Sequence, residues 1–165
     1  MTKLLVLGAG GQIARHAIAM LSGDANIALT LFARSPEKLT QTPANATIVQ
    51  GDVRDRAKLD EAVKGQDIVY ANLTGGDLDA QADSVIASMQ AMGVKRLIFV
   101  LALGIYDEVP GKFGAWNNVT IGEELKPFRR AADAIEASGL DCTIIRPAWL
   151  TDEDEVDYEL TERDA

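Results

Sequence analysis

The chain has 165 residues, and its 47% hydrophobic and 25% charged content is that of one globular domain. The formal net charge of −9 is concentrated at the C-terminal end, where the stretch TDEDEVDYELTERDA carries eight acidic residues and one arginine, so we expect a nearly neutral domain over residues 1–150 and an acidic tail over 151–165. There is no basic stripe of the kind that binds nucleic acid and no apolar run of the roughly 18 residues that a membrane span needs, so neither partner is expected.

Apolar runs and helical patterns alternate along the chain. The apolar runs are mostly continuous rather than alternating, which is typical of parallel strands that are covered on both faces. Several of the helical stretches end in glycine, the usual C-terminal stop of a helix. In chain order we predict a strand at 3–9, a helix at 11–23, a strand at 26–33, a short helical turn within 35–41, a strand at 46–52, a helix at 56–65, a strand at 67–73, a helix at 78–93, a strand at 95–103, a helix at 121–139 and a strand at 141–150.

This strand–helix–strand repeat implies right-handed crossovers and therefore a doubly wound parallel sheet. We predict an α/β fold of the Rossmann type, with strand order 3-2-1-4-5-6 and three layers, α/β/α. Two features interrupt the pattern. Pro127 should kink the last helix or start it anew. Residues 104–120 predict a loop of 17 residues, which at the carboxyl end of a strand is typical of a functional segment.

The segment GAGGQIAR, residues 8–15, follows the first strand and opens the first helix. It fails the pattern G-x-G-x-x-G because Ile13 occupies the last position, but it fits G-x-x-G-x-x-G/A with Gly8, Gly11 and Ala14. Such small residues allow a tight turn, let the backbone approach a pyrophosphate and let the helix pack closely on the strand. The phosphates then bind free N–H groups at the helix N-terminus. The segment therefore predicts a nucleotide site.

The end of the second strand indicates which nucleotide binds. NAD-binding proteins usually carry Asp or Glu there to bind the ribose 2′-hydroxyl, whereas this chain has Arg34 and Ser35. A guanidinium can form a planar, charge-assisted fork with the extra 2′-phosphate of NADP, and the serine adds a hydroxyl. We therefore expect NADP(H), with NAD(H) as the alternative. The other interpretation of Arg34 is an exposed arginine beside a loop.

Polar residues follow the next two strands as well. Asp52 and Val53 close the third strand, where the carboxylate can accept a hydrogen bond from the adenine amino group. Asn72 and Leu73 close the fourth strand, which lies next to the first in the predicted sheet. Because ligands of open α/β sheets bind where the strand order reverses, we expect these residues to complete a cofactor cleft.

Several segments together resemble a known family: GAGGQIAR, FARSPEKL, GDVRD, KRLIFV…GIYDE and ASGLDCTIIRPAWL. They are similar to atypical short-chain dehydrogenase/reductases of the NmrA-like, NAD(P)H-binding type, which include flavin and biliverdin reductases of the B type, quinone reductases and redox-sensing regulators. The resemblance spans nearly all of residues 3–150. It implies a nicotinamide near the fourth to sixth strands, with Pro147 beside it. The residues that it implies for NADP(H) binding are Gly8, Gly11, Gln12, Ile13, Arg34, Asp52 and Val53.

The chain departs from the family at the catalytic residues. Standard members use Tyr-x-x-x-Lys, but none of the tyrosines at 70, 106 and 158 has a lysine four positions later. The fifth strand ends in apolar residues where the family often has a serine pair. The catalytic residues are therefore left unassigned, and a lone histidine with a lone cysteine predicts no metal site. Family members usually continue with another strand and helix, so the acidic stretch after residue 150 indicates a reduced substrate end or a truncated product.

Redox chemistry remains compatible with the sequence because hydride transfer belongs to the cofactor. The predicted loop offers Tyr106, Phe113 and Trp116 for stacking on a flat small-molecule acceptor, with ordinary loop packing as the alternative. We expect an NADPH-dependent reductase of flavins or quinones. The rival hypotheses are a non-catalytic NADP(H) redox sensor and, more weakly, a saccharide or isoprenoid epimerase-like enzyme. A homodimer and, from the single cysteine, a cytoplasmic location are further expectations.

Overall fold

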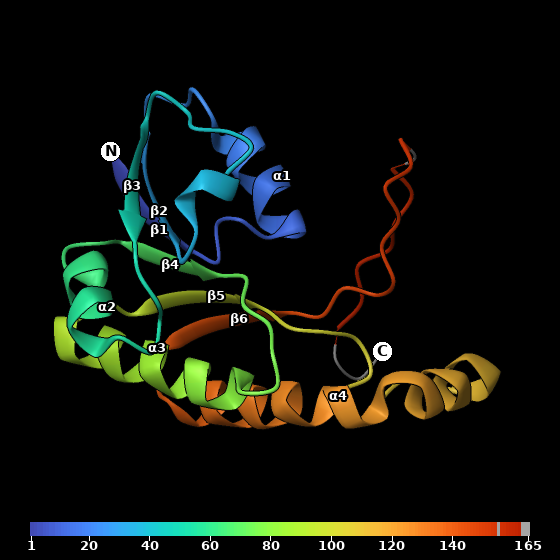
Figure 1. Cartoon of the computed structure of the whole chain (residues 1–165). Coiled ribbons are helices and arrows are strands. Elements are labelled where there is room, and N and C mark those ends of the chain that lie inside the picture. Colours follow the sequence, from blue (N-terminus) through green and yellow to red (C-terminus); the bar gives the residue numbers. More distant parts are fainter. Residues whose placement is uncertain (155, 163–165) are drawn as a thin grey trace.

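The computed structural model describes residues 1–154 and 156–162, and across them six parallel strands pair in the order β3-β2-β1-β4-β5-β6 (Figure 1). This confirms the predicted α/β fold and strand order. The strands are β1 (Thr2–Leu7), β2 (Ile27–Ala33), β3 (Ala46–Gln50), β4 (Ile68–Ala71), β5 (Arg96–Val100) and β6 (Asp141–Ile145). The helices are α1 (Gln12–Leu21), the 3-10 helix η1 (Pro36–Lys38), α2 (Arg56–Val63), α3 (Leu78–Met92) and α4 (Gly111–Ala137).

Two apolar clusters cover the two faces of the sheet. Successive side chains of a strand point to opposite faces, so in β1 Leu5 and Leu7 join the larger cluster while Val6 joins the smaller one. The larger cluster packs beneath α2, α3 and α4, and the smaller one packs beneath α1 through Ala14 and Ile18. Helix α1 therefore lies on the opposite face from α2, α3 and α4 (Figure 1). The sheet extends from β1 in two directions, toward β2 and β3 on one side and toward β4, β5 and β6 on the other. Because every crossover is right-handed, the helices of the two directions lie on opposite faces.

The long helix α4 corrects the sequence-based prediction. Residues 111–120 were expected in a loop, but α4 begins at Gly111 and continues through Pro127 to Ala137 without restarting. Gly114 allows this start, because a Cβ there would overlap the carbonyl oxygen of Val109. The packing of α4 against α3 and the sheet stabilises a helix whose first turns have low intrinsic propensity.

The last two strands are shorter than predicted. The apolar runs 95–103 and 141–150 continue past the sheet edge, where β5 ends at Val100 and β6 at Ile145. Residues 151–154 and 156–162 are exposed and form no helix or strand. Within the described part of the chain, none of the helices combines the length and apolar character needed to cross a bilayer.

Candidate functional site

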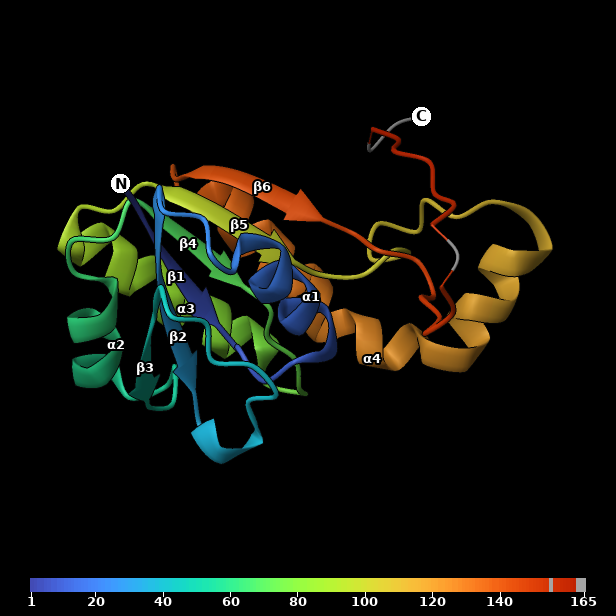
Figure 2. The same cartoon turned by 90° about the horizontal axis from the view of Figure 1, so that it is seen from above.

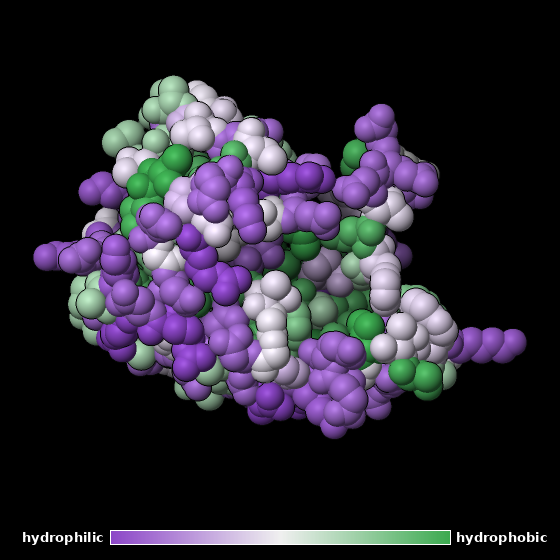
Figure 3. Space-filling view, viewed as in Figure 1, coloured by the Kyte–Doolittle hydropathy of each residue, from purple (hydrophilic) through white to green (hydrophobic). Residues whose placement is uncertain are grey.

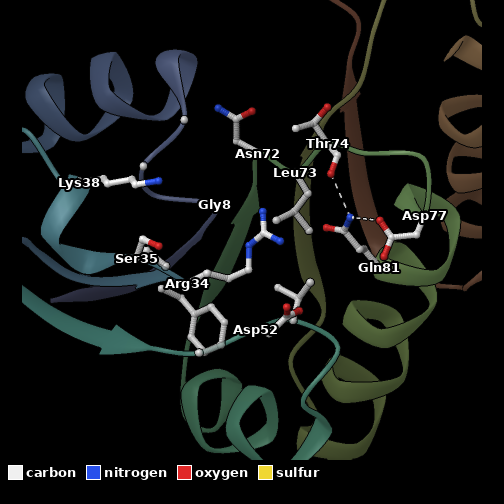
Figure 4. Close-up of a pocket in the computed structure, with 16 residues that line it drawn as sticks. Gly8, Arg34, Ser35, Lys38, Asp52, Asn72, Leu73, Thr74, Asp77 and Gln81 are labelled. Atoms are coloured by element: carbon white, nitrogen blue, oxygen red, sulfur yellow. Dashed lines mark hydrogen bonds between the residues drawn. The ribbon is translucent and has the colours of Figure 1, made fainter.

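A cleft of about 300 Å³ lies at the carboxyl edge of the sheet, beyond the ends of β1 to β4 (Figure 4). The structure brings most of the predicted cofactor residues together in this cleft. Those that line it are Gly8, Gly11, Arg34, Ser35, Asp52, Val53, Asn72 and Leu73. Gln12, Ile13 and Pro147 do not line it. The first two begin α1, and the third follows β6.

The glycine turn brings β1 against the end of β4. Gly8 has a φ of 72°, and a Cβ there would overlap the backbone oxygen of Asn72, so the turn requires glycine for two independent reasons. The N–H of Gly11 donates to the Gly8 oxygen at 2.9 Å, which closes the turn. Ala14 is fully buried against the sheet, as expected of the third small position. The backbone is thus exposed to the cleft without side chains in between.

The N-terminus of α1 carries unsatisfied donors toward this turn. Its N-cap, Gly11, makes no side-chain capping bond and no acidic residue lies in the first turn, whereas Asp55 caps α2 by accepting from the Lys58 N–H at 3.2 Å. The amide Nδ2 of Asn72 is also buried without a hydrogen-bond partner among the described residues. Buried or terminal donors of this kind are normally satisfied. A diphosphate placed here would accept from both, so the residues present fit a dinucleotide.

Two cations face the cleft from the segment after β2. Figure 4 shows the Arg34 side chain extending into the cleft and Lys38 of η1 pointing toward it. None of the ion pairs among the described residues engages either side chain. Ser35 precedes η1, and its hydroxyl makes no capping bond. These groups are therefore available to an anionic ligand.

The opposite wall is polar and internally bonded. Asp52 accepts from the Arg54 N–H at 2.8 Å, and the Arg54 guanidinium pairs with Asp77 at 3.1 Å. Gln81 donates to both the Asp77 carboxylate (2.8 Å) and the Thr74 oxygen (2.9 Å), as the dashed lines in Figure 4 show. The bond from Gln81, followed by those from the Asp77 backbone and Arg54, holds the pKa of Asp77 below its usual value despite some desolvation. Asp77 is therefore ionised at neutral pH, and its carboxylate joins Arg54 and Gln81 in this wall.

Sequence reasoning missed part of the cleft. Most of the missed residues adjoin strand ends that it had already identified, so the carboxyl-edge rule was sufficient to find them. Two others come from the start of α3, which folds over the edge and gave no sequence signal. The missed residues are Gly10, Phe32, Ala33, Lys38, Gly51, Thr74, Asp77 and Gln81.

The three aromatic residues expected to bind an acceptor do not form one surface, and none lines the cleft. Tyr106 lines a separate hollow of about 190 Å³, where Arg129 lies 4.7 Å from its ring centre. Phe113 and Trp116 lie on the first turns of α4 and stack at 5.7 Å between ring centres. Trp116 in turn contacts Trp149, at 5.3 Å, which sequence reasoning did not single out. Because α4 begins at Gly111, Phe113 and Trp116 lie on the helix, whereas Tyr106 lies before it and apart from them.

A nearly buried ion pair joins the segment after β5 to the residue that follows β6. Arg146 donates to Glu108, and both side chains are about 15% exposed. Glu108 also accepts from the backbone N–H groups of Gly104 (3.0 Å) and Tyr106 (2.9 Å). Burial alone would raise the pKa of Glu108, but the backbone donors and Arg146 outweigh it and leave the pKa lowered. The pair holds the segment after β5 against the end of β6.

The described residues contain no group of three or more His, Cys, Asp or Glu side chains arranged to hold a metal ion. The single histidine of the sequence, His16, is exposed on α1.

The fold and the cleft together define a Rossmann-type nucleotide-binding protein. The chain belongs to the NAD(P)H-binding family, whose sequence profile matches residues 8–165. A structure titled as a Rossmann-fold NAD(P)-binding family protein from Shigella flexneri is 60% identical, with a TM-score of 0.85 over 99% of this chain and 75% of that one. A short-chain dehydrogenase/reductase from Veillonella parvula in complex with NADP shares the fold, with 24% identity, a TM-score of 0.82 and 93% and 72% coverage.

Two curated relatives extend the comparison. An uncharacterized sugar epimerase, YhfK, of Bacillus subtilis is 32% identical over 92% of this chain and 73% of its own length. A (4-alkanoyl-5-oxo-2,5-dihydrofuran-3-yl)methyl phosphate reductase of Streptomyces griseus is 30% identical over 87% of this chain. The aligned part is 46% of that reductase, so the chain spans about half of its length. The neighbours are thus atypical short-chain dehydrogenase/reductases and epimerase-like proteins.

Proposed function

We propose that this protein binds NADP(H) in preference to NAD(H) and passes hydride from NADPH to a planar small-molecule acceptor such as a flavin or a quinone. The observation that carries the proposal is the end of β2, where Arg34 and Lys38 face the cleft outside the ion pairs of the described residues and the two positions directly after the strand, Arg34 and Ser35, carry no carboxylate. A carboxylate there would accept from a ribose 2′-hydroxyl, whereas two cations suit a 2′-phosphate.

The residues of the cleft divide the binding of the dinucleotide among them. Arg34 and Lys38 would hold the 2′-phosphate, with the Ser35 hydroxyl beside it. The turn at Gly8 and the free N–H groups of α1 would hold the diphosphate, with Asn72 Nδ2 as an additional donor. When bound, the dinucleotide supplies the hydride. The chain contributes position and electrostatics.

The missing Tyr-x-x-x-Lys motif favours acceptors that need no strong acid. A ketone becomes an alkoxide when it takes hydride and therefore needs a proton donor in place. A quinone or flavin spreads the new charge over its ring system and can take its proton from water. This chemistry supports a planar, conjugated acceptor over a simple carbonyl compound.

The test combines binding with turnover. Calorimetric titration should show NADPH binding at least tenfold tighter than NADH, a difference of about 1.4 kcal/mol. NADPH oxidation should then be followed by absorbance with a panel of flavins and quinones and with an aliphatic aldehyde as the control acceptor. Equal affinities for the two cofactors would contradict the NADP preference. No oxidation with any acceptor at high protein concentration would contradict the reductase.

A second candidate is a redox sensor that binds the cofactor without turnover. It is favoured by Leu101, which is 4% exposed and directly follows β5, where the family often has a serine. A sensor should discriminate NADP⁺ from NADPH by more than tenfold, whereas a reductase has no such requirement. The same titration, repeated with NADP⁺, separates the two candidates.

A further inference from the structure

The segment after β6, residues 147–152, crosses the carboxyl edge of the sheet from one face to the other. It begins beside β5, where the Pro147 oxygen accepts from the Leu103 N–H at 3.0 Å. Asp152 at its far end pairs with Arg15 of α1 at 3.2 Å. In between, the indole Nε1 of Trp149 donates to Asn117 of α4 at 3.0 Å. Because α1 and α4 cover opposite faces, these contacts hold the segment across the edge (Figure 2).

Trp149 is exposed yet held in place. Its side chain is 56% exposed, while its partner Asn117 is 3% exposed in the packed side of α4. Trp116 supports the indole from one side at 5.3 Å, with an angle of 49° between the ring planes. Because its N–H is bonded to Asn117 and part of its ring is exposed, the indole can offer an apolar face of fixed orientation to a planar ligand. Figure 3 shows a hollow between α4 and the C-terminal segment, with apolar residues on its inner wall.

The position of Trp149 along the edge agrees with a role at the far end of the cofactor. Arg34 follows β2, Gly8 follows β1 and Thr74 follows β4, so the cleft runs across neighbouring strands in that order. With the 2′-phosphate at the first and the diphosphate at the second, the nicotinamide must extend toward β5 and β6. Strands lie about 4.8 Å apart. The end of β6 is therefore about 10 Å from the end of β4, and Trp149 lies four residues beyond Ile145, a reach of at most about 14 Å of extended chain.

We propose that Trp149 stacks on the acceptor, and that Asn117 is a positioning residue that holds the indole for this purpose. The site would select planar aromatic acceptors, and Phe113 and Trp116 would support the indole rather than contact the acceptor. This inference rests on the proposed function, because it assumes that a dinucleotide lies in the cleft. It extends that function by assigning the acceptor side to the crossing segment, away from Tyr106.

The experiment compares Trp149→Ala and Trp149→Phe with wild-type protein. Tyr158→Ala is the matched control, because it removes another exposed aromatic ring, 74% exposed, from the C-terminal segment. The first readout is KM for a flavin and a quinone, and the second is the Kd of NADPH. The third is the Kd of the flavin mononucleotide for protein saturated with NADP⁺, which needs no turnover.

We expect Trp149→Ala to raise the acceptor KM and the flavin Kd at least fivefold, with the Kd of NADPH unchanged within twofold. Trp149→Phe keeps a ring but loses the bond to Asn117, so its effect should be about half as large on a logarithmic scale. Tyr158→Ala should match wild type. An unchanged acceptor KM and flavin Kd in Trp149→Ala would overturn the inference while leaving the reductase in place.

The positioning role has its own readout. The chain has two tryptophans, so Trp116→Phe leaves the Trp149 indole as the only one, and its fluorescence anisotropy reports how firmly it is held. In that background, Asn117→Ala should lower the anisotropy and raise the acceptor KM while kcat changes by less than twofold. Should Asn117→Ala fail to fold, Asn117→Leu, which keeps most of the side-chain volume but accepts no hydrogen bond, is measured by the same anisotropy and kinetics. Unchanged anisotropy in a folded Asn117→Ala protein would contradict the role of Asn117.

Turnover and binding fail differently. Suppose that none of the acceptors supports NADPH oxidation by wild-type protein, but flavin binds and its Kd depends on Trp149. The reductase proposal would then be wrong, and the stacking site would be retained. If wild-type protein binds NADPH but neither binds nor reduces any planar compound, the stacking site is wrong.

Discussion

The two halves of the carboxyl edge are built differently. Beyond β1 and β2 the site consists of backbone N–H groups at the start of α1 and cations that form no ion pair with the described residues, such as Arg34. Beyond β5 and β6 the side chains are paired with one another, as in Glu108 with Arg146 and Trp149 with Asn117. Donors and charges without protein partners are available to bind a ligand, whereas side chains that pair with one another fix the local structure. In the proposed function, the first half would supply binding energy for a dinucleotide, and the second would define the geometry in which an acceptor meets it.

The largest effect is expected from Gly8→Ala, in the half of the edge beyond β1 and β2. A left-handed φ costs a non-glycine residue about 1–2 kcal/mol, and forced overpacking costs about 1–3 kcal/mol more. We expect a loss of about 3 kcal/mol in the free energy of unfolding and no NADPH-dependent rise in Tm. Thermal and urea unfolding with and without NADPH measure both.

Two other glycines provide controls for this prediction. Gly23 has a φ of 77° but open space around its Cβ position, and Gly10 has neither constraint. Gly23→Ala should therefore cost only the backbone part, about 1–2 kcal/mol, and Gly10→Ala should leave the stability of the free protein unchanged. A Gly8→Ala protein as stable as Gly10→Ala would contradict the tight approach of the turn to Asn72.

Arg34→Asp tests the free cations of the same half. Because a charge-assisted hydrogen bond contributes about 1.5–3 kcal/mol and the new carboxylate repels phosphate, NADPH should bind about 10–100-fold more weakly. NADH should lose far less. Lys95→Asp makes a similar charge reversal at the amino end of β5, away from the cleft, and should affect neither cofactor. Calorimetry on the three proteins decides, and equal losses for NADPH and NADH would mean that Arg34 does not contact the 2′-phosphate.

Glu108→Gln tests the ion pair with Arg146 in the half of the edge beyond β5 and β6. At neutral pH it should lower the free energy of unfolding by about 2 kcal/mol, because a charged acceptor of three hydrogen bonds is lost. The folded-state pKa of Glu108 lies below its ordinary value of 4.5, so the carboxylate stabilises the fold above that value. That contribution is lost as the pH falls through the lowered pKa.

The difference between wild type and Glu108→Gln should therefore shrink as the pH is lowered below 4.5. Chemical unfolding at a series of pH values measures it. Glu124→Gln, an exposed change on α4, should stay within about 0.5 kcal/mol of wild type at every pH. A difference for Glu108→Gln that is independent of pH would show that the ion pair is not its source.

The smallest effect is expected from Asp152→Asn, which removes the exposed pair with Arg15. Exposed ion pairs contribute about 0–1 kcal/mol, so unfolding free energy should change by less than about 0.5 kcal/mol and the acceptor KM should not change. Unfolding and steady-state kinetics measure the two. A clear rise in KM would show that the crossing segment is held by α1 rather than by the bond between Trp149 and Asn117.

Much of the half beyond β1 and β2 could be predicted from local sequence. The spacing of Gly8, Gly11 and Ala14 defined the turn because each position has its own steric requirement within a few residues of chain. The presence of Arg34 and Ser35 directly after β2, where NAD-binding proteins usually carry Asp or Glu, was equally visible. Lys38 was missed although it stands four residues after Arg34, because a single helical turn separates them and its direction depends on η1.

The half beyond β5 and β6 could not be predicted in the same way. The predicted loop over 104–120 contained glycines and polar residues, which suggested irregular structure, yet α4 begins within it because Gly114 packs against Val109. Tyr106 was expected beside Phe113 and Trp116 and lies apart from them. Each of these outcomes depends on packing between elements, which propensity and periodicity do not describe.

By itself, the sequence determined the alternation of strands and helices, the order of the parallel sheet and the glycine turn at its centre. These follow from apolar periodicity and from steric rules that act over short stretches of chain. Only the tertiary structure decided how the β5–β6 end is shaped. Glu108 and Arg146 are 38 positions apart, and Asn117 and Trp149 are 32 apart. Such partners meet only after β5, β6 and α4 have packed, because no local preference brings them together.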